Sequence, residues 1–444
     1  MSAALAERIV QEHAAASDAL PSSVVSPERR LSAVAALAAE GLPTTRDDNW
    51  KYANLRSVER VRFSPATAAG RTTITAADLP PTVAGYARYV FVDGVFAAEL
   101  SASGSPAGVT VTSLRSPSAR ARSDTRPMNP DMPTASNAPA DERFALLNEA
   151  FATDGAHLHA PRGADCTACV EVLFVATEPS QSAASYPRLE LHVEANARIG
   201  LIERHISARN DANFVNGAVQ VSIGDGARVD HYRVQHAGAH ATWFDTLSAT
   251  VAKNAHYVVH SVNIGGLAAR STSRVRLVGE GAEFSLHVVS LADGQQVHDA
   301  FALVEHIAPN TRSEQNVRGI AAGRARVAFN SKVVVREHAK GTDSRQSLRG
   351  LLAGAQAEID VRPQLEIYTD DVRCNHGATA GKLDDNMLFY MLSRGIERET
   401  AQQLLKWAFL GDVMSRIAVP ELRKQIELSL AGQLKETAVL KELI

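Results

Sequence analysis

Hydrophobic and polar residues alternate with a period of two across about 200 residues in the middle of the chain, from Ala164 to Ala378. The alternating runs include RLELHVEA, GAVQVSI, SRVRLVG, SKVVVRE and PQLEIYT. Such alternation is typical of β-strands with one buried face, because successive side chains of a strand point to opposite sides. Helical periodicity is almost absent from this region, so we expect a domain that is mainly β.

A short phrase with a small central residue recurs between these strands. Its copies stand at 195–199, 225–229, 253–257, 280–284, 323–327 and 355–359, and the first four are spaced 27 to 30 residues apart. A small-residue turn at near-fixed spacing is typical of a solenoid, whose coils stack turn upon turn. An antiparallel sandwich would also give many short strands, but it needs hairpin dipeptides, which are few here. The pattern favours a parallel β-helix, which the handedness rule for crossovers predicts to be right-handed.

Helical periodicity returns at both ends of the chain. Residues 3–40 predict two helices, with Ser26 and Pro27 as a start signal for the second. Residues 141–153 predict another helix, and three more follow Gly381. We therefore expect an N-terminal helical region at 1–160, a β-helix at 161–378 and a C-terminal helical domain at 379–444.

Two further features lie in the N-terminal region. YARYVFVDGVFAAEL alternates around Asp93-Gly94, a dipeptide typical of a two-residue hairpin turn. TRPMNPDMPTASNAPA, at 125–140, has the composition of a linker or surface loop.

Composition and charge narrow the class of protein. The net charge of −3 gives no basic surface of the kind that binds nucleic acid or anionic membranes. The N-terminus lacks the uninterrupted apolar core of a signal peptide, and no run reaches the roughly 18 apolar residues that span a bilayer. Three cysteines in 444 residues argue against a disulfide framework and for a reducing compartment. We expect a cytoplasmic protein.

Three motifs suggest chemistry but have ordinary structural explanations. Cys166 and Cys169 have the spacing of a metal knuckle or redox pair, yet ADCTACVEVLFV predicts a strand, in which residues three apart point to opposite faces. The fifteen histidines form no HExxH pattern. GATAGKL, at 377–383, has only three residues between its glycines and lacks the hydroxyl residue of a phosphate loop. The chain itself is therefore predicted not to hydrolyse ATP.

Cys374 and His376 form the strongest candidate site. Two residues apart on a strand, they share a face with Cβ atoms about 6 to 7 Å apart, close enough to bind one metal ion together. Arg373 would favour the thiolate, whereas Asp370 and Asp371 would oppose it. Zinc and iron–sulfur sites usually need four ligands, so a working site requires further ligands from a second chain, and a small buried cysteine is the alternative.

Residues 329–396, which contain REHAKGTDSRQSLRGLLAGAQAEIDVRPQLEIYTDDVRCNHGATAG, resemble the SufB/SufD family of SUF iron–sulfur cluster assembly scaffolds. RDDNWKYANL, at 46–55, resembles the N-terminal region of that family. SufB-like chains typically have Glu-His-Glu-Ala-Thr where this chain has Cys374-Asn375-His376-Gly377-Ala378-Thr379, which favours the SufD branch. Asn375 stands where the family often has serine.

The resemblance implies a noncatalytic scaffold with a right-handed parallel β-helix between helical domains. It implies pairing with SufB through the C-terminal coils, docking of the ATPase SufC on the C-terminal helices, and homodimers when the chain is expressed alone. Cys374 and His376 would bind iron or the nascent cluster transiently, in a site shared with SufB.

Two other functions compete with this one. A SufB-type paralogue would itself bind a cluster and accept persulfide sulfur. A carbohydrate-active β-helix protein would need carboxylates along a groove and is usually exported, whereas the acids of this chain gather mainly at turns.

Overall fold

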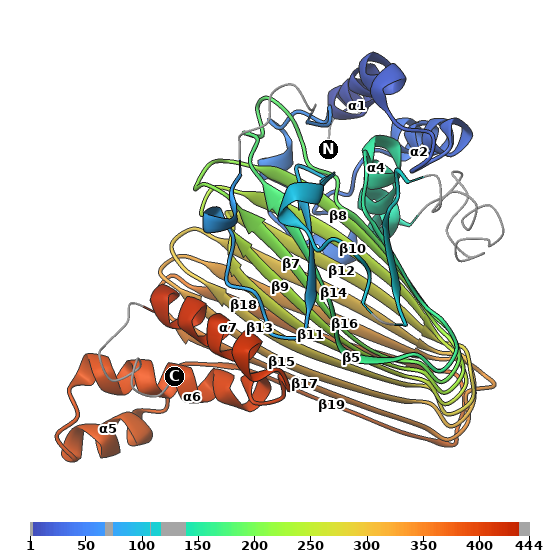
Figure 1. Cartoon of the computed structure of the whole chain (residues 1–444). Coiled ribbons are helices and arrows are strands. Elements are labelled where there is room, and N and C mark those ends of the chain that lie inside the picture. The colour runs from blue at the N-terminus through green and yellow to red at the C-terminus, as the bar shows by residue number, and fades with distance from the viewer. Residues whose placement is uncertain (1–2, 67–73, 107, 117–138, 435–444) are drawn as a thin grey trace.

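The computed structural model describes residues 3–66, 74–106, 108–116 and 139–434, and its centre is a solenoid of about eight turns made of two facing sheets (Figure 1). The strands of the first sheet, in chain order, are β1 (Ala87–Val92), β2 (Val95–Ala97), β5 (Asp165–Ala176), β7 (Arg198–Ser207), β9 (Arg228–Ala237), β11 (His256–Gly265), β13 (Glu283–Ala292), β15 (Arg312–Ala322), β17 (Thr342–Ala353) and β19 (Val372–Gly381). Those of the second sheet are β3 (Thr110–Ser113), β4 (Ala156–Ala160), β6 (Arg188–Val193), β8 (Phe214–Ile223), β10 (Thr242–Val251), β12 (Ala268–Leu277), β14 (Val297–His306), β16 (Arg326–Val335) and β18 (Glu358–Ile367).

The strands from β4 to β19 alternate between the sheets, and each pairs in parallel with the strand two positions away along the chain. The prediction of a parallel β-solenoid is therefore confirmed, and the antiparallel sandwich is excluded. Only β1 with β2 and β3 with β4 pair antiparallel among the named strands. The right-handed sense of the coil stays a prediction.

The recurring phrase marks a stack of tight turns between the second sheet and the first. In the six turns from β6–β7 to β16–β17, one residue has positive φ, and this residue is Asn or Gly: Asn196, Gly226, Asn254, Gly281, Asn310 and Gly341. Both residue types tolerate this left-handed conformation. The alanines that follow the first four are fully buried, so the small residue of the phrase lets successive turns stack.

The turn stack departs from the predicted repeat in its later copies. The phrases at 323–327 and 355–359 lie at the opposite end of the strands, in the turns from β15 to β16 and from β17 to β18. In the first stack, Thr311 and Thr342 replace alanine, and the Thr342 hydroxyl donates to the carbonyl of Ala339 at 2.7 Å. The change from alanine to threonine explains why the repeat looked irregular there.

The N-terminal helices pack on one another, and the third of them packs on the outer face of the second sheet. They are α1 (Ala3–Ala16), α2 (Pro27–Glu40) and α4 (Arg143–Phe151). Ser26 caps α2 by accepting from the backbone of Arg29, as the sequence predicted. The buried Trp50 stacks on Phe144, and the Arg270 guanidinium lies 4.2 Å from the Trp50 ring. The RDDNWKYANL stretch thus joins the helices to the solenoid.

The C-terminal helices are α5 (Asp385–Ser393), α6 (Arg398–Met414) and α7 (Pro420–Gln433). Leu410, Val413, Leu422 and Ile426 of α6 and α7 belong to one buried cluster with residues from the outer face of the first sheet. Figure 1 shows α6 and α7 beside the solenoid and α5 further out. In the described parts of the chain, no helix combines the length and apolarity needed to cross a bilayer.

Two further sequence predictions can be compared with the structure. The hairpin around Asp93-Gly94 is confirmed, since β1 and β2 pair antiparallel across that turn. The predicted linker at 125–140 lies almost entirely outside the described residues.

Cys166 and Cys169 form a disulfide, with their Cα atoms 5.0 Å apart. The prediction that the two side chains point to opposite faces is wrong, because the ladder between β5 and β7 shifts register between Cys166 and Val170. A bulge of this kind breaks the two-residue alternation that the prediction assumed. The pair is one local cross-link in β5, with no framework of bridges.

Candidate functional site

Cys374 and His376 lie on β19, the last strand of the first sheet. β19 pairs in parallel with β17, and this register places Cys374 beside Ser344 and His376 beside Gln346. Both neighbours on β17 are buried, and Cys374 packs against the solenoid core. The shared face predicted from the spacing is therefore the inner face of the coil, at the open end of the solenoid.

The interior below these two residues is polar and hydrogen-bonded. The Ser313 and Ser344 hydroxyls lie 2.9 Å apart, and His306 Nε2 lies 2.9 Å from the Ser313 hydroxyl. Gln346 Nε2 donates to the Ser331 hydroxyl at 2.6 Å. The sequence analysis did not predict these buried polar side chains. The available signal was the presence of Ser344 and Gln346 at alternate positions of β17. The last coil thus covers polar groups as well as the apolar core.

Electrostatics at Cys374 favour the neutral thiol. Burial raises the pKa of Cys374, a hydrogen bond with the backbone of Ser344 opposes this shift, and the charge of Asp343 adds to it. The acid that acts on the thiol is thus Asp343 of the adjacent strand rather than Asp370 or Asp371, which the sequence suggested. A metal ion bound here has to displace the thiol proton.

We expect alkylation of Cys374 by iodoacetamide to accelerate by about tenfold per pH unit from pH 7 upward, because only the thiolate reacts and a raised pKa keeps its fraction small. The acceleration should continue beyond the pH at which a model thiol reaches its plateau. Mass spectrometry of the Cys374 peptide, after treatment of the full chain with a chelator, measures the rate, with glutathione as the reference. A plateau at lower pH than glutathione would contradict the raised pKa.

The described residues contain no third ligand for this site. Only two groups of at least three His, Cys, Asp or Glu side chains have ligand atoms close enough to share a metal ion there, namely His159, His192 and Glu194, and Glu203, His205 and Asp245. Neither group includes Cys374 or His376. A metal site at Cys374 and His376 would therefore need ligands from outside the described part of the chain.

The last coil leaves both sheets open. β18 and β19 are terminal in their sheets, so each has one backbone edge without a neighbouring strand in the described chain. Val361, Leu365 and Val372 are only half-buried although they pack on the core, and Ile367 and Tyr368 are exposed. An unpaired edge that carries apolar residues is a template for pairing with another chain.

The first C-terminal helix carries a second exposed apolar surface. Met387, Phe389 and Tyr390 of α5 are 56, 72 and 59% exposed, whereas Leu388 is buried. The predicted apolar stripe of α6 is partly used within the chain, since Ala401 and Val413 are buried. The surplus apolar surface therefore lies mainly on α5.

Fold and site together define a β-solenoid protein whose candidate ligands lie at an open, unpaired end. Residues 174–409, more than half of the chain, match the family "SUF system FeS cluster assembly, SufBD core domain", and residues 10–172 match "SufBD protein N-terminal region". The chain belongs to the SufB/SufD family of iron–sulfur cluster assembly proteins.

Relatives cover nearly the whole chain. Iron–sulfur cluster assembly protein SufD of Escherichia coli is 28% identical over 87% of this chain and 88% of its own length. An iron–sulfur cluster assembly SufBD family protein of Synechocystis is 26% identical over 90% and 89%, and one of Mycobacterium tuberculosis is 25% identical over 89% and 90%. The chain is thus SufD-like within its family.

Proposed function

We propose that this chain is a noncatalytic scaffold subunit that acts in iron–sulfur cluster assembly together with a SufB-type chain and a SufC-type ATPase. Cys374 and His376 supply part of a transient site for iron or the nascent cluster, and the SufB-type chain supplies the other ligands. The observation that carries this proposal is the position of both residues on the inner face of the last, unpaired coil.

Pairing through β18 and β19 would bring two solenoids end to end. Their unpaired edges and half-buried apolar residues support this contact, because a partner strand would satisfy the backbone groups and cover the core. A second copy of this chain would use the same edge when no other partner is present. Such a homodimer would place two copies of Cys374 and His376 near its two-fold axis.

The helical domain at 379–444 is proposed to dock the ATPase, while the region at 1–160 and the right-handed β-helix at 161–378 form the rigid body of the scaffold. Exposed Phe389 and Tyr390 support docking on α5. Residues 377–381 of the GATAGKL phrase lie in strand β19 rather than in a loop that opens a helix, which supports the absence of nucleotide chemistry in this chain. We place the protein in the cytoplasm, where ATP and ferrous iron are available.

The test is co-expression with the SufB and SufC partners, followed by size exclusion and by analysis of iron and acid-labile sulfide. We expect Cys374→Ala and His376→Ala each to reduce the iron and cluster content of the purified complex by at least about tenfold, because each variant removes one of the two ligands that this chain is proposed to supply. The complex itself should still form, since Cys374 is only half-buried and His376 is exposed.

Asn375→Ala is the matched control, because Asn375 lies between the two ligands and points to the other face of β19. Its complex should retain the parental iron and sulfide content. Parental content in both ligand variants would refute the site. A third outcome is that the complex assembles normally but the cluster forms only on the partner chain. The scaffold role of this chain would then stand, and its role as a source of ligands would be refuted.

A further inference from the structure

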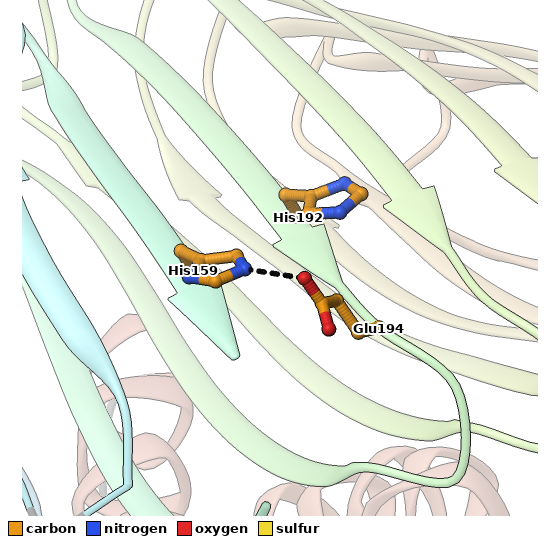
Figure 2. Close-up of side chains that lie close together, drawn as sticks. All are labelled: His159, His192 and Glu194. Carbon is orange, nitrogen blue, oxygen red and sulfur yellow. Dashed lines mark hydrogen bonds and ion pairs between the residues drawn. The ribbon is translucent and has the colours of Figure 1, made fainter. Parts of the chain in front are cut away.

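Two histidines and a glutamate gather on the outer face of the second sheet, in the first coils of the solenoid (Figure 2). His159 lies on β4, His192 lies on β6, and Glu194 follows β6 at the turn. His159 Nε2 and Glu194 Oε1 are 3.0 Å apart, and the ligand atoms of all three residues lie within 4.8 Å of one another. All three side chains are partly exposed.

The β-ladder fixes these residues in place. His159 and His192 are directly paired in the register of β4 and β6, and their rings stack with centroids 5.5 Å apart at an interplanar angle of 7°. The backbone of Glu194 donates to the carbonyl of Ala160 at 2.8 Å. The three Cα positions are thus held by hydrogen bonds of the solenoid itself, so that only side-chain rotation is needed to bring the ligand atoms together.

Two hydrogen bonds orient the carboxylate of Glu194. It already holds one oxygen toward His159 and the other toward the backbone of Arg162, at 3.0 Å.

We propose that His159, His192 and Glu194 form a binding site for a divalent first-row transition metal such as Fe²⁺ or Zn²⁺. Two imidazoles and one carboxylate are ligands that these ions accept, with metal–ligand distances of about 2.0 to 2.2 Å. Ligand atoms of a tetrahedral ion are then about 3.4 Å apart, so the observed spacing closes with small rotations of the rings. Three protein ligands leave a position for water, which makes the ion exchangeable.

Other histidine groups in the described chain lack this combination. The rings of His260 and His287 are also close, with centroids 5.0 Å apart and planes tilted by 38°, but both residues are buried and no carboxylate joins them within ligand distance. Glu203, His205 and Asp245 are buried inside the solenoid, where Arg233 already pairs with both carboxylates. Among the described residues, the cluster on β4 and β6 is therefore the one accessible group with three candidate ligands.

The metal site and the site at Cys374 lie near opposite ends of the solenoid. Six turns of the stack separate Glu194 from the turn that precedes β19, which corresponds to about 30 Å at a strand spacing of about 4.8 Å. The inference about the metal site does not depend on the proposed function, because it rests on different residues.

The test uses Co²⁺ with the full chain, purified without a polyhistidine tag and without reductant, in a Cys374→Ala/His376→Ala background that removes the other site. Calorimetry and visible absorption should show one equivalent of Co²⁺ bound, with no thiolate charge-transfer band. His192→Ala and Glu194→Gln should each weaken binding by at least about tenfold, because each removes one of three ligands. Glu194→Gln keeps the shape of an exposed side chain, so its fold should be intact by circular dichroism.

His256→Ala is the matched control. His256 Nδ1 lies 3.0 Å from Glu283 Oε2 on neighbouring strands, and both side chains are partly exposed, yet no third ligand lies near this pair among the described residues. Its Co²⁺ affinity should equal that of the background. The proposal would be overturned if His192→Ala and Glu194→Gln both bind Co²⁺ within twofold of the affinity of the Cys374→Ala/His376→Ala background. It would also be overturned if that background binds Co²⁺ with a Kd above about 1 mM. In either case the proposed function, which depends on Cys374 and His376, would be unaffected.

Discussion

Arg233→Ala is expected to destabilise the solenoid by about 3–5 kcal/mol, the usual cost of removing one partner from a buried ion pair. Arg233 Nη2 lies 2.9 Å from Glu203 and 2.8 Å from Asp245 inside the coil, and all three side chains are almost completely buried. Burial alone would lower the pKa of Arg233, but the charges of Asp245 and Glu203 raise it. Without the guanidinium, two carboxylates would remain buried with no matching charge.

Urea denaturation of the full chain, followed by far-UV circular dichroism, measures this change. Arg228→Ala is the control on the same strand β9, because Arg228 is 58% exposed and lies 3.7 Å from Asp230. A surface pair of this kind contributes at most about 1 kcal/mol. Equal denaturation midpoints for the two variants would show that the buried network does not stabilise the fold.

The sequence could not place Arg233 inside the coil. In strands with one buried face, alternation assigns apolar residues to the inside and polar residues to the outside. Glu203 breaks this assignment, because it is a charged residue on the inner side of β7, and its partner Arg233 stands 30 residues away on β9. A buried charge can be predicted only when its partner on the neighbouring coil is known. This requires the register between coils, which the local pattern of residues does not specify.

Features determined by neighbouring residues were predictable. The cap at Ser26 and the hairpin at Asp93-Gly94 depend on local backbone preferences, and the structure confirms both. The bulge after Cys166 was not predictable, because it depends on how β5 pairs with β7.

The candidate site also has one feature that the sequence predicts and one that it does not. The common face of Cys374 and His376 follows from their spacing on one strand, whereas the direction of that face, toward the open interior, requires the pairing with β17. His159 and His192 are 33 residues apart, close to the repeat length of the coil. A search for pairs of histidines separated by one repeat of the coil could have found them.

Phe389→Asp/Tyr390→Asp is expected to abolish binding of the SufC-type ATPase, with a loss of affinity of at least about 100-fold, because two exposed aromatic anchors would be replaced by charges in the contact. Phe389 and Tyr390 are 72 and 59% exposed on α5. Their replacement removes no buried packing, so the unfolding midpoint of the isolated chain should not change. Calorimetric titration of the purified chain with the ATPase measures the affinity.

Leu31→Asp is the matched control for this experiment. Leu31 is 63% exposed on α2, which packs on α4 in the N-terminal region, so the variant introduces a charge at similar exposure but away from the C-terminal helices. Its affinity for the ATPase should stay at the parental value. If the double variant also binds at the parental value, α5 is not the docking surface, and the contact has to use the exposed parts of α6 and α7. Loss of binding in both variants would instead indicate a general effect of added negative charge.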